Sequence, residues 1–252
     1  MKLRGLGRLA VAAFMIALLY PLAGLFAPIG RWRWSETAGS TFAAAQTSIV
    51  LTAFAMAIVV VLGTPIALYL RRCNLRERLL WQALMIVSVL LPPLALGLLL
   101  SLAFGPNAFG TLLARAGIHT ANSATAFVAT QVYVSIGYYV LAAVAAFDAV
   151  PKALEHQAAL LGVPPWRVFL RVTLPLAQLG LAVALSLAWV RALGEFGAVV
   201  VTAYYPAGMP VQLWVDLESY GLPAVMPLLV VFLVTALPLP WLAHVVAQRR
   251  HA

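Results

Sequence analysis

Six apolar segments of about 20 residues constrain what this chain can fold into more than any motif within it. An α-helix needs about 20 apolar residues to cross the ~30 Å hydrocarbon core of a bilayer. Every backbone N–H and C=O group in that core must be hydrogen-bonded inside the protein, which a helix achieves within one segment. The six segments are Leu9–Phe26, Thr47–Leu70, Leu79–Phe104, Ala124–Phe147, Leu174–Phe196 and Ala224–Ala247. We therefore predict an all-α integral membrane protein with six transmembrane helices, in one domain over residues 1–252.

The composition indicates the same class of protein. Hydrophobic residues make up 64% of the chain, charged residues make up 9%, and the mean hydropathy is +0.99. Soluble domains are about 45–50% apolar and about 25% charged, so a soluble fold could not cover its surface with this set of residues. The third segment contains Pro92-Pro93, and we expect its helix to be kinked there.

Lys and Arg gather on one side of the predicted membrane topology. If the N-terminus is cytoplasmic, the inside set is Lys2, Arg4, Arg8, Arg71, Arg72, Arg76, Arg78, Lys152, Arg167, Arg171, Arg249 and Arg250, and the outside set is Arg31, Arg33 and Arg115. Cytoplasmic loops carry an excess of Lys and Arg, so we place both termini and the loop 148–175 in the cytoplasm of a cell-membrane (inner or plasma membrane) protein. The net charge of +9 then sets topology and meets anionic membrane lipid, and it predicts no nucleic-acid partner.

A polar stretch, Leu154–Pro175, lies between the fourth and fifth apolar segments. After Pro151 a short helical run should stop at Gly162, a residue that is free to take a left-handed turn. A second short helix is expected over Trp166–Val172, and Pro175 is expected to begin the fifth membrane helix. Such a helix-turn-helix would form a rigid knob that could fill a groove in a soluble partner. The alternative is an ordinary basic loop that lies on the lipid headgroups.

The order of residue types in this stretch is specific. Leu154, Glu155, Ala158, Leu161, Gly162, Leu174 and Pro175 stand at the positions that define the coupling loop of permease subunits in ABC-type importers. The stretch therefore resembles that loop, with His156 and Gln157 where the family usually has Glu and Ala. Gly63–Ala67 and Leu91–Pro93 resemble two further family motifs, and the resemblance covers roughly residues 45–246.

The resemblance implies the type I importer permease arrangement, with a cytoplasmic coupling helix between the fourth and fifth membrane helices. The implied partners are two copies of an ATP-binding subunit, a second permease that we expect to be identical, and an extracytoplasmic solute-binding protein. The chain itself would be non-catalytic and would bind no cofactor, because ATP and Mg²⁺ would be held by the ATP-binding subunit. The residues implied to couple to that subunit are Glu155, His156, Gln157, Ala158, Gly162, Trp166, Arg167 and Pro175.

A second motif concerns the substrate. Arg191 is the only cation inside an apolar segment, and an intramembrane charge is a functional candidate by default. Glu195 lies one helical turn away, so the two side chains could pair. The run Arg191–Ala198 resembles a signature of sulfate, molybdate and tungstate permeases, and its continuation through Tyr204–Pro206 and Gly221–Pro227 is most similar to the molybdate/tungstate branch. The resemblance thus implies a tetrahedral oxyanion as cargo.

Two roles remain open for this charged pair at the sequence level. Arg191 and Glu195 could be a structural ion pair that fixes the helix in the bundle, or Arg191 could contact the moving anion. The residues predicted to belong to the translocation path or its gate are Arg191, Glu195, Phe196 and Ser135.

Other classes of function remain as alternatives. One is an importer permease for another substrate, such as polyamine, thiamine, iron or phosphonate. The other is a membrane protein without a transport role, either a scaffold or an intramembrane enzyme. The enzyme is disfavoured because the chain has no HExxH, GxxxxGK[ST] or GxSxG motif, and its four histidines are scattered.

Overall fold

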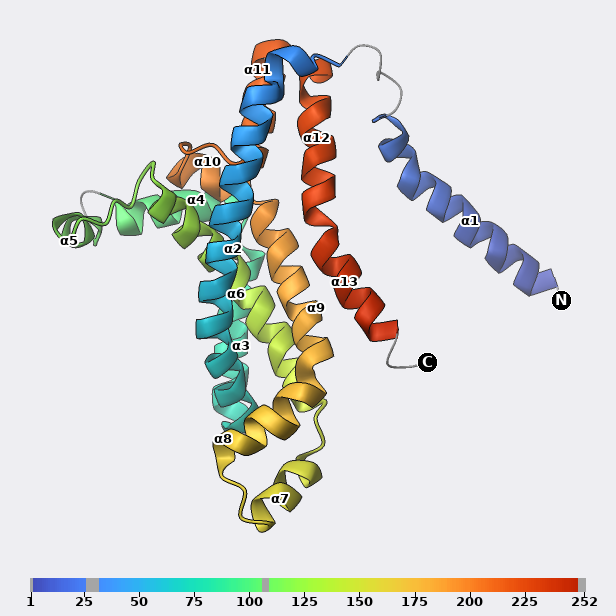
Figure 1. Ribbon diagram of the computed structural model, residues 1–252, viewed down its shortest axis with the longest axis vertical. Helices are drawn as coiled ribbons and strands as arrows, with labels where there is room; N and C mark the ends of the chain where they lie inside the picture. The colour runs from blue at the N-terminus through green and yellow to red at the C-terminus, as the bar shows by residue number, and fades with distance from the viewer. Residues whose placement is uncertain (1, 26–31, 106–108, 249–252) are drawn as a thin grey trace.

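In a computed structural model of the protein, residues 2–25, 32–105 and 109–248 are described, and all regular structure in these ranges is helical. Three long helices form the centre of the bundle (Figure 1): α2 (Trp34–Arg72), α6 (Ala124–Asp148) and α9 (Leu174–Leu193). The remaining elements are α1 (Lys2–Ala23), α3 (Leu75–Leu90), α4 (Pro93–Phe104), α5 (Gly110–Arg115), α7 (Lys152–Leu160), α8 (Pro165–Val168), the π-helical turn η2 (Phe169–Thr173), α10 (Gly197–Thr202), α11 (Met209–Tyr220), α12 (Leu222–Ala236) and α13 (Pro238–Gln248).

Small residues let the three central helices approach one another closely. A Cβ atom added at Gly63 of α2 would lie 2.6 Å from the ring of Tyr139 on α6. A Cβ atom at Gly180 of α9 would lie 2.4 Å from the Cβ atom of Ala146, also on α6. Apolar surface in lipid gives little drive for helix association, so close packing through small residues is the usual substitute. The core between these helices is accordingly rich in buried Ala and Val.

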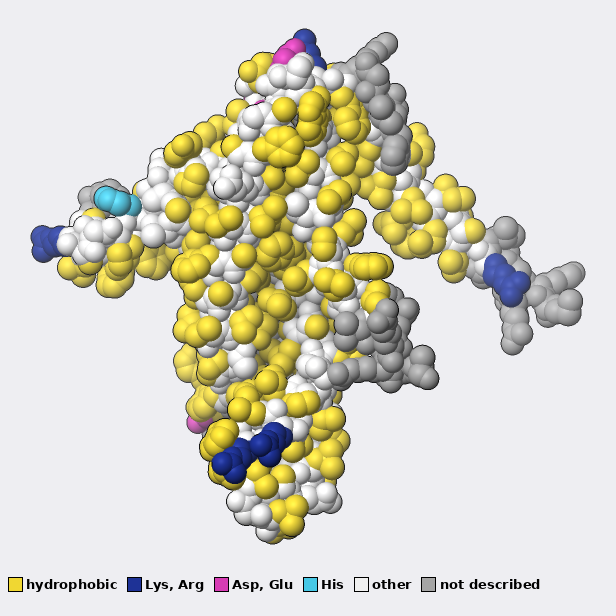
Figure 2. All heavy atoms as spheres, viewed as in Figure 1, with side chains coloured by type: hydrophobic (Ala, Val, Ile, Leu, Met, Phe, Trp, Pro, Cys, Tyr) yellow, Lys and Arg dark blue, Asp and Glu magenta, His cyan; other side chains and the backbone are white. Residues whose placement is uncertain are grey.

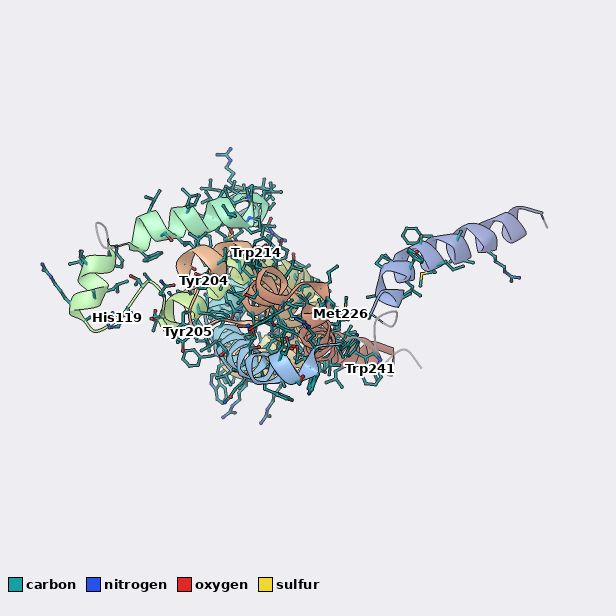
Figure 3. The ribbon with its side chains drawn as sticks, turned by 90° about the horizontal axis from the view of Figure 1, so that it is seen from above. His119, Tyr204, Tyr205, Trp214, Met226 and Trp241 are labelled. Carbon is teal, nitrogen blue, oxygen red and sulfur yellow. The ribbon has the colours of Figure 1, made fainter. Side chains whose placement is uncertain are left out.

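Within the described ranges, four helices are long and apolar enough to cross a membrane, which is fewer than the six predicted segments. They are Trp34–Arg72, Ala124–Asp148, Pro165–Leu193 and Leu222–Ala243. The bent pair α3 and α4 would make a fifth span, and α1 contributes only a shorter apolar stretch, Val11–Ala23. Phe26, the end of the first predicted segment, lies outside the described residues. Figure 1 and Figure 3, which are turned by 90° relative to each other, both show α1 standing apart from the bundle.

The third predicted segment is broken rather than merely kinked. The break falls at Leu91 and Pro92, as the prolines predicted, but α3 and α4 meet at 108°. The prolines remove backbone donors at the break, and packing sets the new direction. A Cβ atom at Gly97 of α4 would lie 2.9 Å from the backbone of Ala198 on α10, so these two short helices are in close contact. The kink predicted within Leu79–Phe104 is therefore a sharp break between two helices.

The face of the bundle shown in Figure 2 is strongly apolar. Phe54 on α2 is 62% exposed, Leu90 on α3 is 74% exposed and Leu102 on α4 is 74% exposed. Contiguous apolar surface of this extent is uncommon on soluble monomers. The bundle is that of a multi-pass membrane protein, whose outer face meets lipid.

The two ends of the bundle carry different structures. At one end lie α7 and α8, and at the other lies α11 (Figure 1). The stretch VQLWVDLESY lies within one short helix, α11. The backbone N–H of Met209 in α11 donates to the hydroxyl of Ser48 in α2 over 2.7 Å, which ties this helix to the bundle.

Candidate functional site

The polar stretch after α6 forms a helical knob, defined here as residues 151–173, at one end of the bundle (Figure 1). Helix α7 ends at Leu160, and Gly162 has a φ of +77° with no atom near the position of a Cβ. The predicted helix stop and left-handed glycine turn are thus confirmed. Leu160 and Leu161 at the turn are 88% and 84% exposed, so the tip of the knob presents apolar side chains.

The second arm of the knob differs from the prediction. A helix does restart near Trp166, but it runs without a break from Pro165 to Leu193. Pro175 is the second residue of α9, as predicted for the start of the fifth membrane helix, but helical backbone precedes it from Pro165. A proline inside a helix cannot donate to the preceding turn and its ring crowds that turn. The chain widens into the π-helical turn η2 directly before Pro175, where the N–H of Leu174 bonds to the carbonyl of Phe169.

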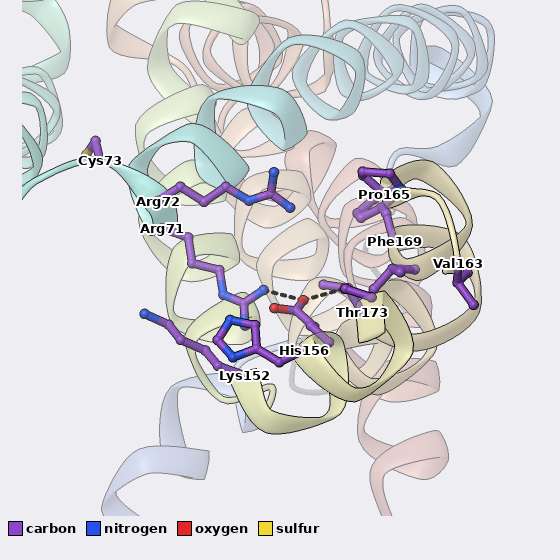
Figure 4. A pocket seen from close by; sticks show the side chains of 12 residues that line it. Arg71, Arg72, Cys73, Lys152, His156, Val163, Pro165, Phe169 and Thr173 are labelled. Carbon is purple, nitrogen blue, oxygen red and sulfur yellow. Dashed lines mark hydrogen bonds and ion pairs between the residues drawn. The ribbon is translucent and has the colours of Figure 1, made fainter. Parts of the chain in front are cut away.

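Glu155 ties the knob to two of the central helices (Figure 4). Its Oε1 accepts a hydrogen bond of 2.7 Å from Nη1 of Arg71, the side chain at the end of α2. The same oxygen accepts a hydrogen bond from the hydroxyl of Thr173, just before α9. Nη2 of Arg71 donates to the carbonyl of Val150 over 2.9 Å, which also anchors the start of the knob. We call Arg71, Glu155 and Thr173 the latch.

The latch holds a nearly buried charge pair. The side chain of Arg71 is 3% exposed and that of Glu155 is 17% exposed. Burial would raise the pKa of the Glu155 carboxyl, but the hydrogen bonds from Thr173 and Arg71 and the charges of Arg71 and Arg72 outweigh burial. The pKa of Glu155 therefore lies below its ordinary value of 4.5. The carboxylate form is the one that the latch requires.

Most of the other predicted coupling residues lie on the surface of the knob, and Pro175 lies just beyond its end. His156, Gln157 and Pro175 are exposed, and Ala158 is half-buried. Trp166 and Arg167 are exposed on α8, where the guanidinium of Arg167 lies 5.0 Å from the centre of the Trp166 ring. Sequence reasoning missed Arg71 and Thr173, because no local pattern links either side chain to Glu155.

Two of the predicted path residues, Arg191 and Glu195, form a corner at the far end of α9. Nη1 of Arg191 forms an ion pair with Oε2 of Glu195, so the pairing predicted from their spacing is confirmed. The other carboxylate oxygen of Glu195 accepts the backbone N–H of Ala198 at 2.6 Å, so it caps the start of α10. The guanidinium of Arg191 also lies 5.8 Å from the centre of the Tyr138 ring.

The two charges of this corner differ in exposure. The Glu195 side chain is 1% exposed, whereas that of Arg191 is 22% exposed. Gly197 lets the corner pack against α4, because a Cβ atom there would lie 2.8 Å from Pro93.

Phe196 and Ser135 occupy different surroundings. The half-buried Phe196 ring lies 5.9 Å from the Trp214 ring on α11. Ser135 is fully buried and donates to the carbonyl of Gln131 in its own helix. Gln131 joins α6 to its neighbours, since its Nε2 donates to Thr52 of α2 and to the carbonyl of Ala192 on α9. Ser135 as a path residue stays a prediction.

An apolar groove of about 830 Å³ lies along α2, α4, α5 and α6. Its lining includes Phe54, Leu100, Leu113 and Tyr133, together with the hydroxyl of Thr130. None of the four predicted path residues lines this groove. In the parts of the chain that the structure describes, no group of His, Cys, Asp and Glu could hold a metal ion.

Known proteins resemble this chain over most of its length. A probable molybdenum ABC transporter permease protein of Haloferax volcanii is 34% identical over 243 residues, which covers 96% of this chain and 89% of that protein. The molybdate/tungstate transport system permease protein WtpB of Thermococcus kodakarensis is 32% identical over 182 residues, which covers 72% of this chain and 69% of that protein. The molybdenum transport system permease protein ModB of Mycobacterium tuberculosis is 37% identical over 168 residues, with 65% and 64% covered.

Solved structures share the fold. A bacterial alginate ABC transporter, crystallised with an alginate-bound periplasmic protein, aligns with a TM-score of 0.75 at 15% identity over 98% of this chain and 94% of that one. An amino acid ABC transporter aligns with a TM-score of 0.60 at 20% identity over 85% and 96%. Residues 60–251 match the family described as binding-protein-dependent transport system inner membrane component. The chain belongs to this family.

Proposed function

We propose that this chain is the transmembrane permease subunit of an ATP-driven importer for a tetrahedral oxyanion, with molybdate or tungstate as the preferred cargo and sulfate as a further candidate. The observation that carries the proposal is the Arg191–Glu195 corner, in a chain whose relatives are named for molybdenum, molybdate and tungstate transport. The corner offers a half-buried cation near the end of a membrane helix, and a cation is what an oxyanion needs.

The proposed topology has six membrane helices, with α1 as the first and the bent pair α3–α4 as the third. Both termini and the knob would be cytoplasmic. The end of the bundle that carries the knob also carries Arg71, Arg72, Arg76, Arg78, Lys152, Arg167 and Arg171. Such an excess of positive charge supports a cytoplasmic location.

The knob is proposed to dock into a partner ATP-binding subunit, and the latch is proposed to pass on its movement. Leu160 and Leu161 give the tip an apolar surface that a groove in the partner could cover. The latch then joins α7 to the end of α2 through Arg71 and to the start of α9 through Thr173. A displacement of the knob would therefore move two central helices as one body.

Helix α9 is proposed to carry this movement to the cargo path. The continuous helix Pro165–Leu193 is about 44 Å long at 1.5 Å per residue, and it ends at the Arg191–Glu195 corner. Rocking α9 would move Arg191 relative to Tyr138 on α6, so the path could open to one side of the membrane at a time. Weak and repeated contacts suit a path that must release what it admits.

The proposed assembly contains two ATP-binding subunits, a second and identical permease, and an extracytoplasmic solute-binding protein. The solved neighbour that includes a periplasmic protein supports this general arrangement. Within it the chain would be non-catalytic, and ATP hydrolysis with its Mg²⁺ would belong to the ATP-binding subunit.

Two measurements test the function. Affinity purification of the full chain from its own membranes should recover a P-loop ATPase, and failure to recover one would favour a scaffold. The solute-binding protein of the same complex should bind molybdate or tungstate in calorimetry, and binding of a polyamine, thiamine or iron instead would contradict the proposed cargo.

A further inference from the structure

A pocket of about 440 Å³ lies where the knob joins the bundle (Figure 4). One wall carries the cationic side chains of Arg71, Arg72 and Lys152. The facing wall is formed by the apolar side chains of Val163, Pro165 and Phe169. This volume is within the range of small-molecule sites. The pocket thus combines a positive wall with an apolar one.

The positive wall is only partly neutralised. Glu155 offsets the charge of Arg71 through the latch, whereas Arg72 and Lys152 have no ion pair or hydrogen bond to any residue that the structure describes. The exposed imidazole of His156 lies beside Lys152 (Figure 4). Two full positive charges therefore remain at the pocket.

Arg71 adds an unused donor. The residue is 6% exposed, and its Nε–H has no hydrogen-bond partner within the described chain. A buried donor without a partner is costly, so such a donor in a native protein calls for an explanation. An acceptor bound in the pocket would supply one.

We propose that this pocket binds the phosphate group of an anionic ligand, with its oxygens on Arg72 and Lys152 and its organic part along Val163 and Phe169. The pocket lies at the ends of two membrane helices, α2 and the helix that begins at Pro165, where phospholipid headgroups are found. Basic pockets between membrane helices at that level suit anionic headgroups. Phosphatidylglycerol is therefore the source that the position favours, and inorganic phosphate is the soluble source of the same chemistry.

The pocket is lined in part by Glu155 and His156, which are among the residues implied to couple to the ATP-binding subunit, but it lies apart from the apolar tip that is proposed to enter a groove of that subunit. Leu160 and Leu161 at the tip are 88% and 84% exposed and do not line the pocket, whereas Arg71 and Arg72 at the end of α2 do. The ligand would sit against the latch and link the knob to the lipid surface. The inference goes beyond the proposed function and holds whatever the importer carries.

The test uses the full-length chain in nanodiscs of phosphatidylcholine with a fixed fraction of phosphatidylglycerol. Native mass spectrometry counts the lipids that stay bound to the protein after the protein is released from the nanodisc. The proteins compared are the wild type, R72Q/K152Q and the control R76Q/R171Q. The control removes two exposed arginines of the same end that do not line the pocket. K152Q alone serves as a second, milder variant.

The expected result is a preference for phosphatidylglycerol that falls by roughly 10- to 30-fold in R72Q/K152Q, while the control changes it by less than about twofold. Inorganic phosphate at millimolar concentration should not displace the lipid. If inorganic phosphate does displace the lipid, the pocket is still a phosphate site, and its ligand comes from solution instead of from the membrane. The proposal would be overturned by an equal loss in both double variants, or by a wild type that shows no preference for phosphatidylglycerol.

Discussion

Glu155 on the knob accepts a hydrogen bond of 2.7 Å from Arg71, which lies 84 positions earlier at the end of α2. The predicted role of Glu155 was a contact with the ATP-binding subunit. Within the chain its carboxylate is occupied by Arg71 and Thr173. This arrangement favours a role in fixing the knob to α2 and α9, and it leaves the exposed residues of the tip for the contact with a partner.

Breaking the latch should uncouple the knob. In E155Q, Arg71 loses its counter-charge while it stays buried, and we expect a loss of roughly 1–3 kcal/mol in the free energy of unfolding. Thermal unfolding in detergent measures this loss, and ATP-driven uptake by the reconstituted complex should fall with it. E77Q is the matched control, because Glu77 lies at the same end of the bundle on α3 and is exposed. Equal changes in unfolding and in uptake for E155Q and E77Q would contradict the role of the latch.

The latch also predicts a dependence of stability on pH. The pKa of Glu155 is lowered in the folded protein, so its contribution is fully present above the ordinary value of 4.5 and is lost as the pH falls through the lower folded value. Wild-type protein should therefore lose stability below about pH 4.5 by more than E155Q does. Unfolding curves between pH 3 and pH 7 give the comparison, and parallel curves for the two proteins would argue against it.

The turn at the tip of the knob depends on Gly162. Its φ of +77° costs an L-residue about 1–2 kcal/mol, and more for a β-branched side chain. We expect G162V to remain inserted in the membrane but to lower ATP-driven uptake. Gly117 has the same φ and also has open space around it, so G117V carries the same strain elsewhere. A similar loss of uptake in G117V would show that the effect is not specific to the knob.

Packing of α4 on α10 depends on Gly97. A side chain there meets the backbone of Ala198 at 2.9 Å, and overpacking of this kind costs about 1–3 kcal/mol. G97L should therefore lower the unfolding temperature of the detergent-purified protein. G39L is the control, because nothing lies within 4 Å of a Cβ at Gly39 in α2. Unchanged stability of G97L would mean that α4 does not pack against α10 in the membrane.

Sequence reasoning found features that depend on neighbouring residues. The helix stop at Gly162 follows from a local glycine pattern, and it is confirmed. The ion pair between Arg191 and Glu195 follows from their spacing of one turn. The position of the break at Pro92 was also predictable, because proline removes a donor wherever it stands in a helix.

Features that depend on distant contacts were out of reach. The 108° angle at Pro92 is set by packing of α4 on α10, about 100 residues later. Helical backbone continues up to Pro175 through a π-helical turn, and no residue pattern predicts that turn. Arg71 and Glu155 are separated in the sequence by four helices, α3 to α6. No local pattern therefore predicts that their side chains pair.

The Arg191–Glu195 corner tests the central claim most directly. The ion pair alone explains why Glu195 can be buried, whereas an oxyanion path requires the cation of Arg191 itself. R191Q leaves Glu195 buried without a counter-charge, so its effect combines both roles. R191Q/E195Q removes the charge pair as a unit and should recover most of the stability that R191Q loses.

The decisive measurement is ATP-driven uptake of radioactive molybdate into proteoliposomes that contain the complete complex with wild type, R191Q or R191Q/E195Q as the permease. The account predicts uptake by the wild type that tungstate inhibits and spermidine does not. It also predicts a loss of roughly tenfold or more in both variants, because each lacks the cation that a charge-assisted hydrogen bond to the anion requires. Wild-type rates in R191Q/E195Q, or a wild-type complex that takes up no molybdate, would contradict it.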